Sequence, residues 1–402
     1  MPEMQIGFFV APTIGTPDEM FQGMAGQRTD LYQRLIADLT DFAQYADEHG
    51  YYGMAFTEHH LSVEGMTVSN NPAILNMFFG AKTKRLRHGA LGYVLPAHNP
   101  LRVAEDIAMV DQLTQGRAFA GFARGIQARW LNTFGQQIPG LADNVTDPQA
   151  YDDLKRELYD EHLDIILKAW TQETFAHHGK HWQIPPPNIR WPAVQYSRDM
   201  GKGVDEHGRV VEVGIAPRCY QRPHPPMFEP FSVSERSIEK AASRGVTPIG
   251  IMTDPAIVRQ QIEAAQRGWA HKGVDRKPGE GIGFARYMIV ANTDREAREI
   301  ASRGMFEWQY FFNMFGFNLV LGRPGEAPQD IPNTVDAYID RHLLYCGSPD
   351  TVCRQLEQTF GRQPVDYLWL FTSNEILDKR TVMRSMELMT TQVFPHFTSA
   401  VG

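Results

Sequence analysis

The sequence predicts an α/β protein, a (β/α)8 TIM barrel with one long insertion, from three observations. Short apolar runs alternate along the chain with amphipathic segments that have helical periodicity. Strands that alternate with helices of about 10–15 residues pair in parallel through right-handed crossovers, and roughly seven or eight such units fit a closed barrel better than an open sheet. No Gly-x-Gly-x-x-Gly opens a helix after the first expected strand, which disfavours a dinucleotide-binding sheet.

The expected strands are short apolar runs bounded by turn-forming or polar residues. They are 4–11, 52–57, 86–95, 118–123, 227–231, 246–252, 285–291 and 366–371, and a further short strand is compatible with 343–346. The expected helices repeat apolar residues every three or four positions. They are 28–48, 71–84, 101–113, 153–170, 234–244, 255–272 and 294–315, followed by a helix up to 340, one from 348, and one up to 393.

Local signals mark several helix ends. Gly50 follows the first helix in the position of a helix-stopping glycine, and Pro72 lies near the start of the second, where a missing N–H costs nothing. Ser348 precedes Pro349 as an N-cap would precede the first helical residue. These signals support the boundaries of the helical segments.

One stretch interrupts the alternation of strands and helices. Residues 175–226 are rich in proline, histidine, glycine and charge, and carry few periodic signals. At about 100–200 residues per domain, a chain of 402 residues could form two domains, but α/β barrels are commonly longer than this and still form one domain. We therefore expect a single barrel domain over 1–402, with 175–226 as an insertion that forms a lid or substrate wall. The histidines between 177 and 181 fit no zinc spacing, and a glycine turn between two short strands is expected there.

Composition excludes several classes of function. The net charge is −8, from 39 basic and 47 acidic residues, which gives no electrostatic reason to expect nucleic acid or an anionic membrane as partner. No apolar run approaches the ~20 residues of a membrane span, and the first residues lack the pattern of a signal peptide. Three unpatterned cysteines argue against a disulfide framework and a zinc cluster. We expect a cytoplasmic protein without a metal site.

A barrel places its chemistry at the carboxyl ends of its strands, and a pair of histidines follows the second expected strand. Residues 57–60 read Thr-Glu-His-His. Adjacent histidines project in different directions, so they cannot chelate one metal as an i, i+4 pair does. Because imidazole titrates near neutrality, His59 or His60 suits proton transfer or a hydrogen bond to a cofactor. The alternative is that these residues only cap the strand and bond to loops.

Three further clusters follow expected strands. The glycines within 89–96 lack side chains, so a flat ligand ring could lie close to the backbone at the barrel mouth; alternatively, they mark a β-bulge. Arg124 ends a strand between Ala123 and Gly125, where its planar fork can bind a phosphate or pair with a surface acid. The serine-rich turn 232–237 enters a helix, where it can form an anion site or an ordinary N-cap.

As an ordered set, these motifs resemble the bacterial luciferase-like flavin monooxygenases. The resemblance runs through nearly the whole chain and rests on the segments 55–60, 70–83, 93–106, 116–125, 234–245 and 347–352. The segments 175–182 and 291–297 are similar to the members that oxygenate terpenoids and cyclic ketones.

The resemblance implies a barrel that binds reduced FMN, delivered by a separate flavin reductase, and reacts it with O₂ to a flavin hydroperoxide. The activity expected is a two-component monooxygenase that oxygenates a small, largely apolar organic substrate. Hydroxylation, epoxidation and Baeyer–Villiger insertion stay open, as do the substrate and the reductase. A homodimer through the helices at 71–84 and 101–113 is also implied.

The resemblance also assigns roles to single residues. His59 matches the catalytic histidine beside the flavin. Ala123 stands where luciferase has a reactive cysteine near the flavin, which makes light emission doubtful. The expected cofactor-binding residues comprise a non-prolyl cis peptide under the flavin ring, the position beside the flavin, and the phosphate contacts: Leu91, Gly92, Ala123, Arg124, Val233, Ser234 and Ser237.

Three other functions compete with this one. A deazaflavin-dependent hydride-transfer enzyme on the same barrel would consume no O₂. A non-catalytic flavin-binding protein would keep the phosphate residues but lose the histidine, so the presence of His59 argues against it. A metal-dependent hydrolase needs ligands on several strand ends, and only the second strand offers them clearly.

Overall fold

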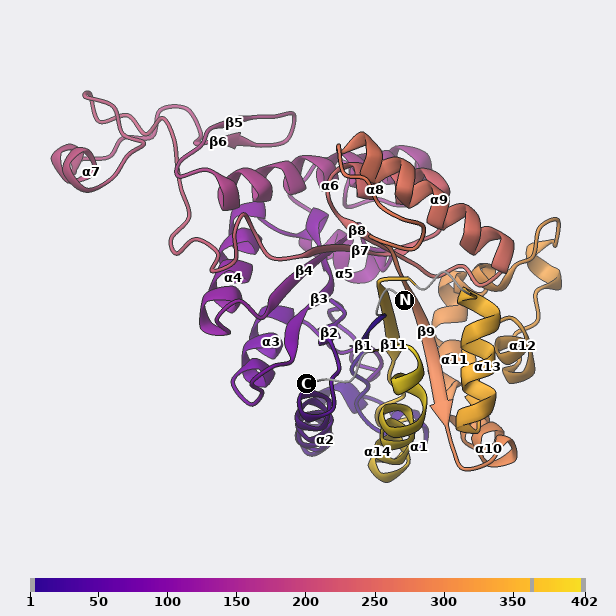
Figure 1. Ribbon diagram of the computed structural model, residues 1–402. Helices are drawn as coiled ribbons and strands as arrows, with labels where there is room; N and C mark the ends of the chain where they lie inside the picture. The colour runs from indigo at the N-terminus through magenta and orange to yellow at the C-terminus, as the bar shows by residue number, and fades with distance from the viewer. Residues whose placement is uncertain (1–3, 362–364, 399–402) are drawn as a thin grey trace. The chain divides into compact units, whose positions relative to one another are not determined.

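The fold is a parallel α/β barrel, as the computed structural model describes it over residues 4–361 and 365–398 (Figure 1). The strands follow the order β1-β2-β3-β4-β7-β8-β9-β11, and β11 pairs with β1 to close the ring. This confirms the predicted barrel. The barrel strands are β1 (Gln5–Val10), β2 (Gly53–Phe56), β3 (Arg87–Val94), β4 (Ala118–Ala123), β7 (Met227–Ser232), β8 (Thr247–Gly250), β9 (Gly283–Val290) and β11 (Tyr367–Phe371).

The helices agree closely with the amphipathic segments of the sequence. The additional short strand compatible with 343–346 is β10 (Leu344–Gly347), which pairs with β9. The longer helices are α2 (Thr29–Glu48), α3 (Pro72–Gly80), α4 (Pro100–Leu113), α6 (Pro148–Thr171), α8 (Glu235–Ser243), α9 (Pro255–His271), α10 (Asp294–Gly304), α13 (Pro349–Phe360) and α14 (Lys379–Leu388). The shorter ones are α1 (Pro17–Phe21), α5 (Ala128–Phe134), α7 (Val194–Met200), α11 (Phe306–Tyr310) and α12 (Val335–Asp340).

Two predicted helices are shorter than expected. The helix expected over 71–84 ends at Gly80. Beyond it, the carboxylate of Asp47 accepts the backbone N–H groups of Lys84, Arg85 and Leu86 at 3.0, 2.6 and 2.6 Å, and these bonds replace helical ones.

The helix expected over 294–315 is also wrong as a single element. It breaks at Met305, whose φ of −90° and ψ of 10° are not helical, and continues as α11 and a 3₁₀ turn at Phe312–Phe315. The break turns Glu307 and Trp308 into the interior, where both are buried. Burial of the Trp308 ring against the barrel outweighs helix propensity, which contributes only tenths of a kcal/mol per residue.

The chain divides into two compact units. The first unit comprises residues 1–92 and 227–402, and its core includes the outer faces of β1, β9 and β11 packed under α2, α13 and α14. The second unit comprises residues 93–226 and contains β4, α4, α5, α6 and the segment that follows them. In the second unit, Trp170 on α6 donates its indole N–H to the carbonyl of Ala104 on α4 at 3.0 Å.

The segment 175–226 of the second unit contains little regular structure. β5 (His177–His178) and β6 (Gln183–Ile184) form an antiparallel pair, which confirms the predicted glycine turn between two short strands. Glu161 on α6 holds this turn by accepting the backbone N–H of Trp182 at 2.8 Å. Farther along, none of the residues of α7 is buried, and in Figure 1 α7 extends away from α6. The single domain over 1–402 and the lid role of this segment stay predictions.

Strand β1 shows how alternate residues serve the two faces of the barrel wall. Phe8 faces outward and meets the ring of Tyr51 at 5.9 Å, whereas Phe9 faces inward and meets Phe231 on β7 at 5.6 Å. No helix within the described residues is both long enough and apolar enough to span a bilayer.

Gly7 on β1 is a sharp test of this packing. A Cβ at Gly7 would lie 2.4 Å from the buried Trp369 ring on the paired strand β11. We expect Gly7→Ala to lower the free energy of unfolding by about 1–3 kcal/mol through overpacking, measured by urea denaturation. Gly201→Ala is the matched control, because a Cβ there would meet only the Ser197 carbonyl at 3.5 Å. Equal stability of the two variants would contradict this account.

Candidate functional site

The loop after β2 holds the predicted catalytic histidine. The backbone N–H of His59 donates to the carbonyl of Ser69 at 3.1 Å, and the hydroxyls of Thr57 and Ser69 lie 2.6 Å apart. The Glu58 carboxylate is buried and lies 3.1 Å from Nε2 of His60. These backbone and side-chain bonds hold the loop that carries His59 at the carboxyl end of β2.

The environment of His59 keeps its imidazole neutral at pH 7. Loss of solvent around the ring lowers the pKa of His59 to about 4; the negative charge of Glu58 raises it in part, and His60 lowers it. A neutral imidazole carries one N–H donor and one acceptor nitrogen. His59 can therefore both donate and accept a hydrogen bond, and can take a proton.

Leu91 and Gly92 lie beside this loop on the neighbouring strand. Phe56, the last residue of β2, pairs with Ala90 on β3, so Leu91 and Gly92 lie one and two residues beyond that pair. Both are buried, and the peptide between them is cis. The expected non-prolyl cis peptide is therefore present at Leu91–Gly92.

The predicted serine cluster lies at the start of α8. Ser234 is the N-cap: its Oγ accepts the backbone N–H of Ser237 at 3.2 Å and lies 2.9 Å from the Ser237 hydroxyl. Val233 is 51% exposed. The acid in the first turn, Glu235, is paired with Arg267 at 3.0 Å. This helix end thus offers hydroxyl groups and backbone N–H groups to an anion, with the adjacent carboxylate neutralised.

In the second unit, Ala123 ends β4 and Arg124 follows it with an exposed side chain. Lys155 on α6 donates to the carbonyl of Gly125 at 3.3 Å. Burial lowers the pKa of Lys155, and the positive charge of Arg124 lowers it further against the opposing effect of Asp152. Two cationic side chains therefore lie close together at the end of β4, and Lys155 is an addition to the predicted set.

Aromatic rings fill the barrel interior of the first unit above these strands. Phe231 stacks on Phe371 with ring centroids 5.9 Å apart, and Phe371 stacks on Tyr287 at 4.6 Å. Phe9 meets both Phe231 and Phe371. We call these four residues the aromatic layer. The layer joins β1, β7, β9 and β11; Phe9, Tyr287 and Phe371 are buried in it and Phe231 is partly buried.

A buried acid beside the aromatic layer was not predicted. Glu307 on α11 is 2% exposed, and burial raises its pKa to about 8, with a hydrogen bond from Thr13 opposing the rise. Its neighbour Trp308 meets Tyr287 edge to face at 5.9 Å. The aromatic run 306–317 is visible in the sequence. The single continuous helix expected there, however, does not show which of these residues face the barrel interior.

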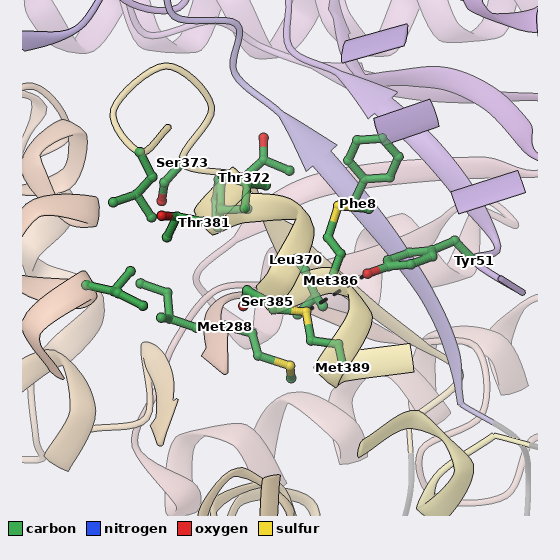
Figure 2. Close-up of a pocket in the computed structure, with 15 residues that line it drawn as sticks. Phe8, Tyr51, Met288, Leu370, Thr372, Ser373, Thr381, Ser385, Met386 and Met389 are labelled. Atoms are coloured by element: carbon green, nitrogen blue, oxygen red, sulfur yellow. Dashed lines mark hydrogen bonds between the residues drawn. The ribbon is translucent and has the colours of Figure 1, made fainter. Parts of the chain in front are cut away.

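The cavity in Figure 2 lies elsewhere, on the outer side of the barrel wall. Its volume is about 40 Å³, and its lining includes Phe8, Tyr51, Met288, Met386 and Met389. The Tyr51 hydroxyl donates to Sδ of Met389 at 3.9 Å, the bond drawn in Figure 2. None of the predicted site residues lines this cavity. It is a packing gap between β1, β9, β11 and α14.

Comparisons with known proteins agree with this geometry. The family model for luciferase-like monooxygenases matches residues 20–366. The chain belongs to the luciferase-like monooxygenase family. The expected enzyme class, an oxidoreductase of the monooxygenase type, is thereby confirmed. The curated relative 2,5-diketocamphane 1,2-monooxygenase 2 of Pseudomonas putida is 24% identical over 404 residues, which is 98% of this chain and 99% of that protein.

Two solved structures share the fold. The first is the oxygenating constituent of 3,6-diketocamphane monooxygenase from Pseudomonas putida, a type II Baeyer–Villiger monooxygenase in complex with FMN. It aligns with a TM-score of 0.74 at 20% identity, over 98% of each chain. The second is an F420-dependent secondary alcohol dehydrogenase, with a TM-score of 0.63 at 12% identity over 97% of this chain and 98% of that one.

The pKa of His59 tests the electrostatics of the site. We expect the ring to titrate with a midpoint near pH 4 by NMR, because desolvation disfavours the imidazolium. Glu58→Gln should lower that midpoint further, since it removes the charge that raises it, and His60→Gln should raise it. A midpoint near 6.5 in the folded protein would show that the ring is solvated.

Proposed function

We propose that this protein is the oxygenase component of a two-component monooxygenase. It uses reduced FMN, supplied by a separate flavin reductase, and O₂ to oxygenate a small, largely apolar organic substrate. The observation that carries the proposal is the donor set at the α8 N-terminus, Ser234 and Ser237 beside exposed Val233, in a chain of the luciferase-like family. The reductase partner is supported by the solved relative, which is named as an oxygenating constituent.

The chemistry of the donors fits FMN. Serine hydroxyls and free N–H groups at a helix N-terminus suit the dianionic phosphate, and a guanidinium grips phosphate oxygens in a planar fork. We propose that Ser234, Ser237 and the Val233 backbone in the first unit bind the phosphate, and we propose a phosphate-binding role for Arg124 in the second unit from the resemblance to the family. Leu91, Gly92 and Ala123 would then support the ring.

When bound, the flavin supplies the chemistry of O₂ activation, and the protein supplies orientation and proton control. His59, neutral at pH 7, is placed to donate a hydrogen bond and to hold or pass a proton. The aromatic layer excludes water from the barrel interior, which protects reactive species from hydrolysis. We also propose that the protein is cytoplasmic.

Flavin binding gives the first test. Arg124→Ala should weaken FMN binding about tenfold to a hundredfold, measured by quenching of flavin fluorescence, because it removes a charge-assisted fork. Arg156→Ala is the control, since Arg156 is an exposed cation of the same unit that pairs with Asp152 and Asp153. An unchanged affinity in Arg124→Ala would remove Arg124 from the phosphate site.

Oxygen incorporation separates the proposal from the deazaflavin alternative. Incubated with reduced FMN, ¹⁸O₂ and a panel of small apolar compounds, the protein should yield products that carry one ¹⁸O atom. A deazaflavin-dependent dehydrogenase, whose fold is also similar, would incorporate none and would bind the deazaflavin instead. Absence of both FMN binding and ¹⁸O incorporation would overturn the proposed function.

We also propose a homodimer through α3 and α4. On α3, Ile74 is 66% exposed and Phe78 39%; on α4, Leu113 is 58% exposed. Ile74→Asp with Phe78→Asp should shift the sedimentation coefficient from dimer to monomer, because charge replaces buried apolar surface. Tyr196→Asp on α7, also highly exposed, should leave the dimer intact. A wild-type chain that sediments as a monomer would refute the dimer.

A further inference from the structure

Three buried polar atoms beside the aromatic layer have no hydrogen-bond partner among the described residues. They are Oε1 of Glu307, the hydroxyl of Tyr287 and Nε1 of Trp308. The three side chains are 2%, 1% and 1% exposed. More than nine in ten buried polar groups in proteins are satisfied, and these three, which belong to residues that adjoin or contact one another, would be satisfied by an occupant that the chain itself does not supply.

The three groups lie together. The rings of Tyr287 and Trp308 meet edge to face at 5.9 Å, and Glu307 precedes Trp308 on α11. The charge of a Glu307 carboxylate acts directly on Tyr287, whose pKa is raised by burial and then by Glu307 and Tyr338. Figure 1 shows α11 beside β9, the strand that carries Tyr287.

Glu307 and its neighbours lie at the end of the barrel where the carboxyl ends of the strands meet. Thr13, which hydrogen-bonds to Glu307, follows β1 at its carboxyl end, and the carbonyl of Thr13 accepts the amide of Asn374 from beyond β11. β2, which leads to His59, pairs in parallel with β1. Strand ends of a parallel sheet share one edge, so the cluster and the proposed catalytic histidine occupy the same end.

The three groups can all donate a hydrogen bond, so the ligand that satisfies them must offer an acceptor. An indole N–H only donates, a phenol donates readily, and a neutral carboxyl group has one O–H to donate. Burial holds Glu307 in the neutral form at pH 7, since its pKa lies at about 8. The occupant therefore offers an acceptor oxygen to the donors and an apolar body to the surrounding rings.

We propose that Glu307, Tyr287 and Trp308 are the positioning residues that bind the carbonyl oxygen of a neutral, apolar substrate against the aromatic layer. The assignment rests on the proposed function for the identity of the site, and it names the residues that anchor the substrate. An alcohol fits less well, because its hydroxyl brings a donor to a group of donors. Internal water is the competing occupant.

The test compares a ketone with a hydrocarbon of the same skeleton. Affinities of the FMN-loaded protein for bicyclo[2.2.1]heptan-2-one and bicyclo[2.2.1]heptane are measured by calorimetry at pH 7. Glu307→Leu should lower the preference for the ketone about fivefold to tenfold, the effect of about one hydrogen bond. Glu307→Gln, whose amide still donates, should change it by about twofold or less. Glu299→Gln, an exposed acid on α10, is the matched control.

The pH dependence of ligand binding distinguishes a protonated Glu307 that donates a hydrogen bond to the ligand from a Glu307 that has only a structural role. Below about pH 8 Glu307 is neutral and donates; above it the carboxylate repels the carbonyl oxygen, so the wild-type preference for the ketone should fall as pH rises from 7 to 9.5. The titratable groups that face it are Tyr287 and, through Tyr287, Tyr338. Glu307→Gln should abolish this pH dependence.

A spectroscopic signature completes the experiment. The ¹³C resonance of a labelled carbonyl should move downfield on binding to the wild type, and less so in Tyr287→Phe, which removes only the hydroxyl, and in Trp308→Phe, which replaces the indole by a smaller ring without a donor. These two variants serve if Glu307→Leu does not fold. Equal ketone preference in all variants, with a flat pH profile, would overturn the assignment in favour of bound water. Failure to bind FMN would instead contradict the proposed function, so the two outcomes are distinct.

Discussion

The ring packing of Phe9, Phe231, Phe371 and Tyr287 inside the barrel is the constraint on which the other features of the first unit depend. Aromatic side chains from strands on opposite sides of the barrel meet in one layer, which makes this part of the barrel interior apolar. Tyr287 of that layer packs edge to face on Trp308 of α11, so the layer gives α11 an apolar surface. Glu307 precedes Trp308 on α11 and is buried with it.

Desolvation sets the protonation of the two titratable groups that matter most. It lowers the pKa of His59 to about 4 and raises that of Glu307 to about 8, so both side chains are neutral at pH 7. Opposite shifts from one cause leave both side chains uncharged and able to form hydrogen bonds, and the buried Glu58 carboxylate is the charged group that acts on His59. Other charged groups are exposed, as at Arg124 and at the ion pair between Glu235 of α8 and Arg267 of α9.

Features that depend on neighbours in the sequence were predicted well. Ser234 caps α8 because its hydroxyl reaches an N–H three residues away, and the strand signals at 227–231 and 366–371 place β7 and β11 to within a residue. Predictions failed where a distant contact decides. Asp47, more than thirty residues away, accepts the backbone N–H groups of the residues just beyond α3, and the long helix breaks at Met305 where Trp308 is buried against the barrel.

The sequence by itself determined the barrel, the family and the residues at the strand ends, because hydrophobic periodicity and short ordered motifs are local properties of the chain. Only the tertiary structure decided which residues of the aromatic run 306–317 face the interior, and that Lys155 lies beside Arg124. It also decided that Glu307 is held neutral. Inward orientation and desolvation arise from strands far apart in the chain, and no local pattern encodes them.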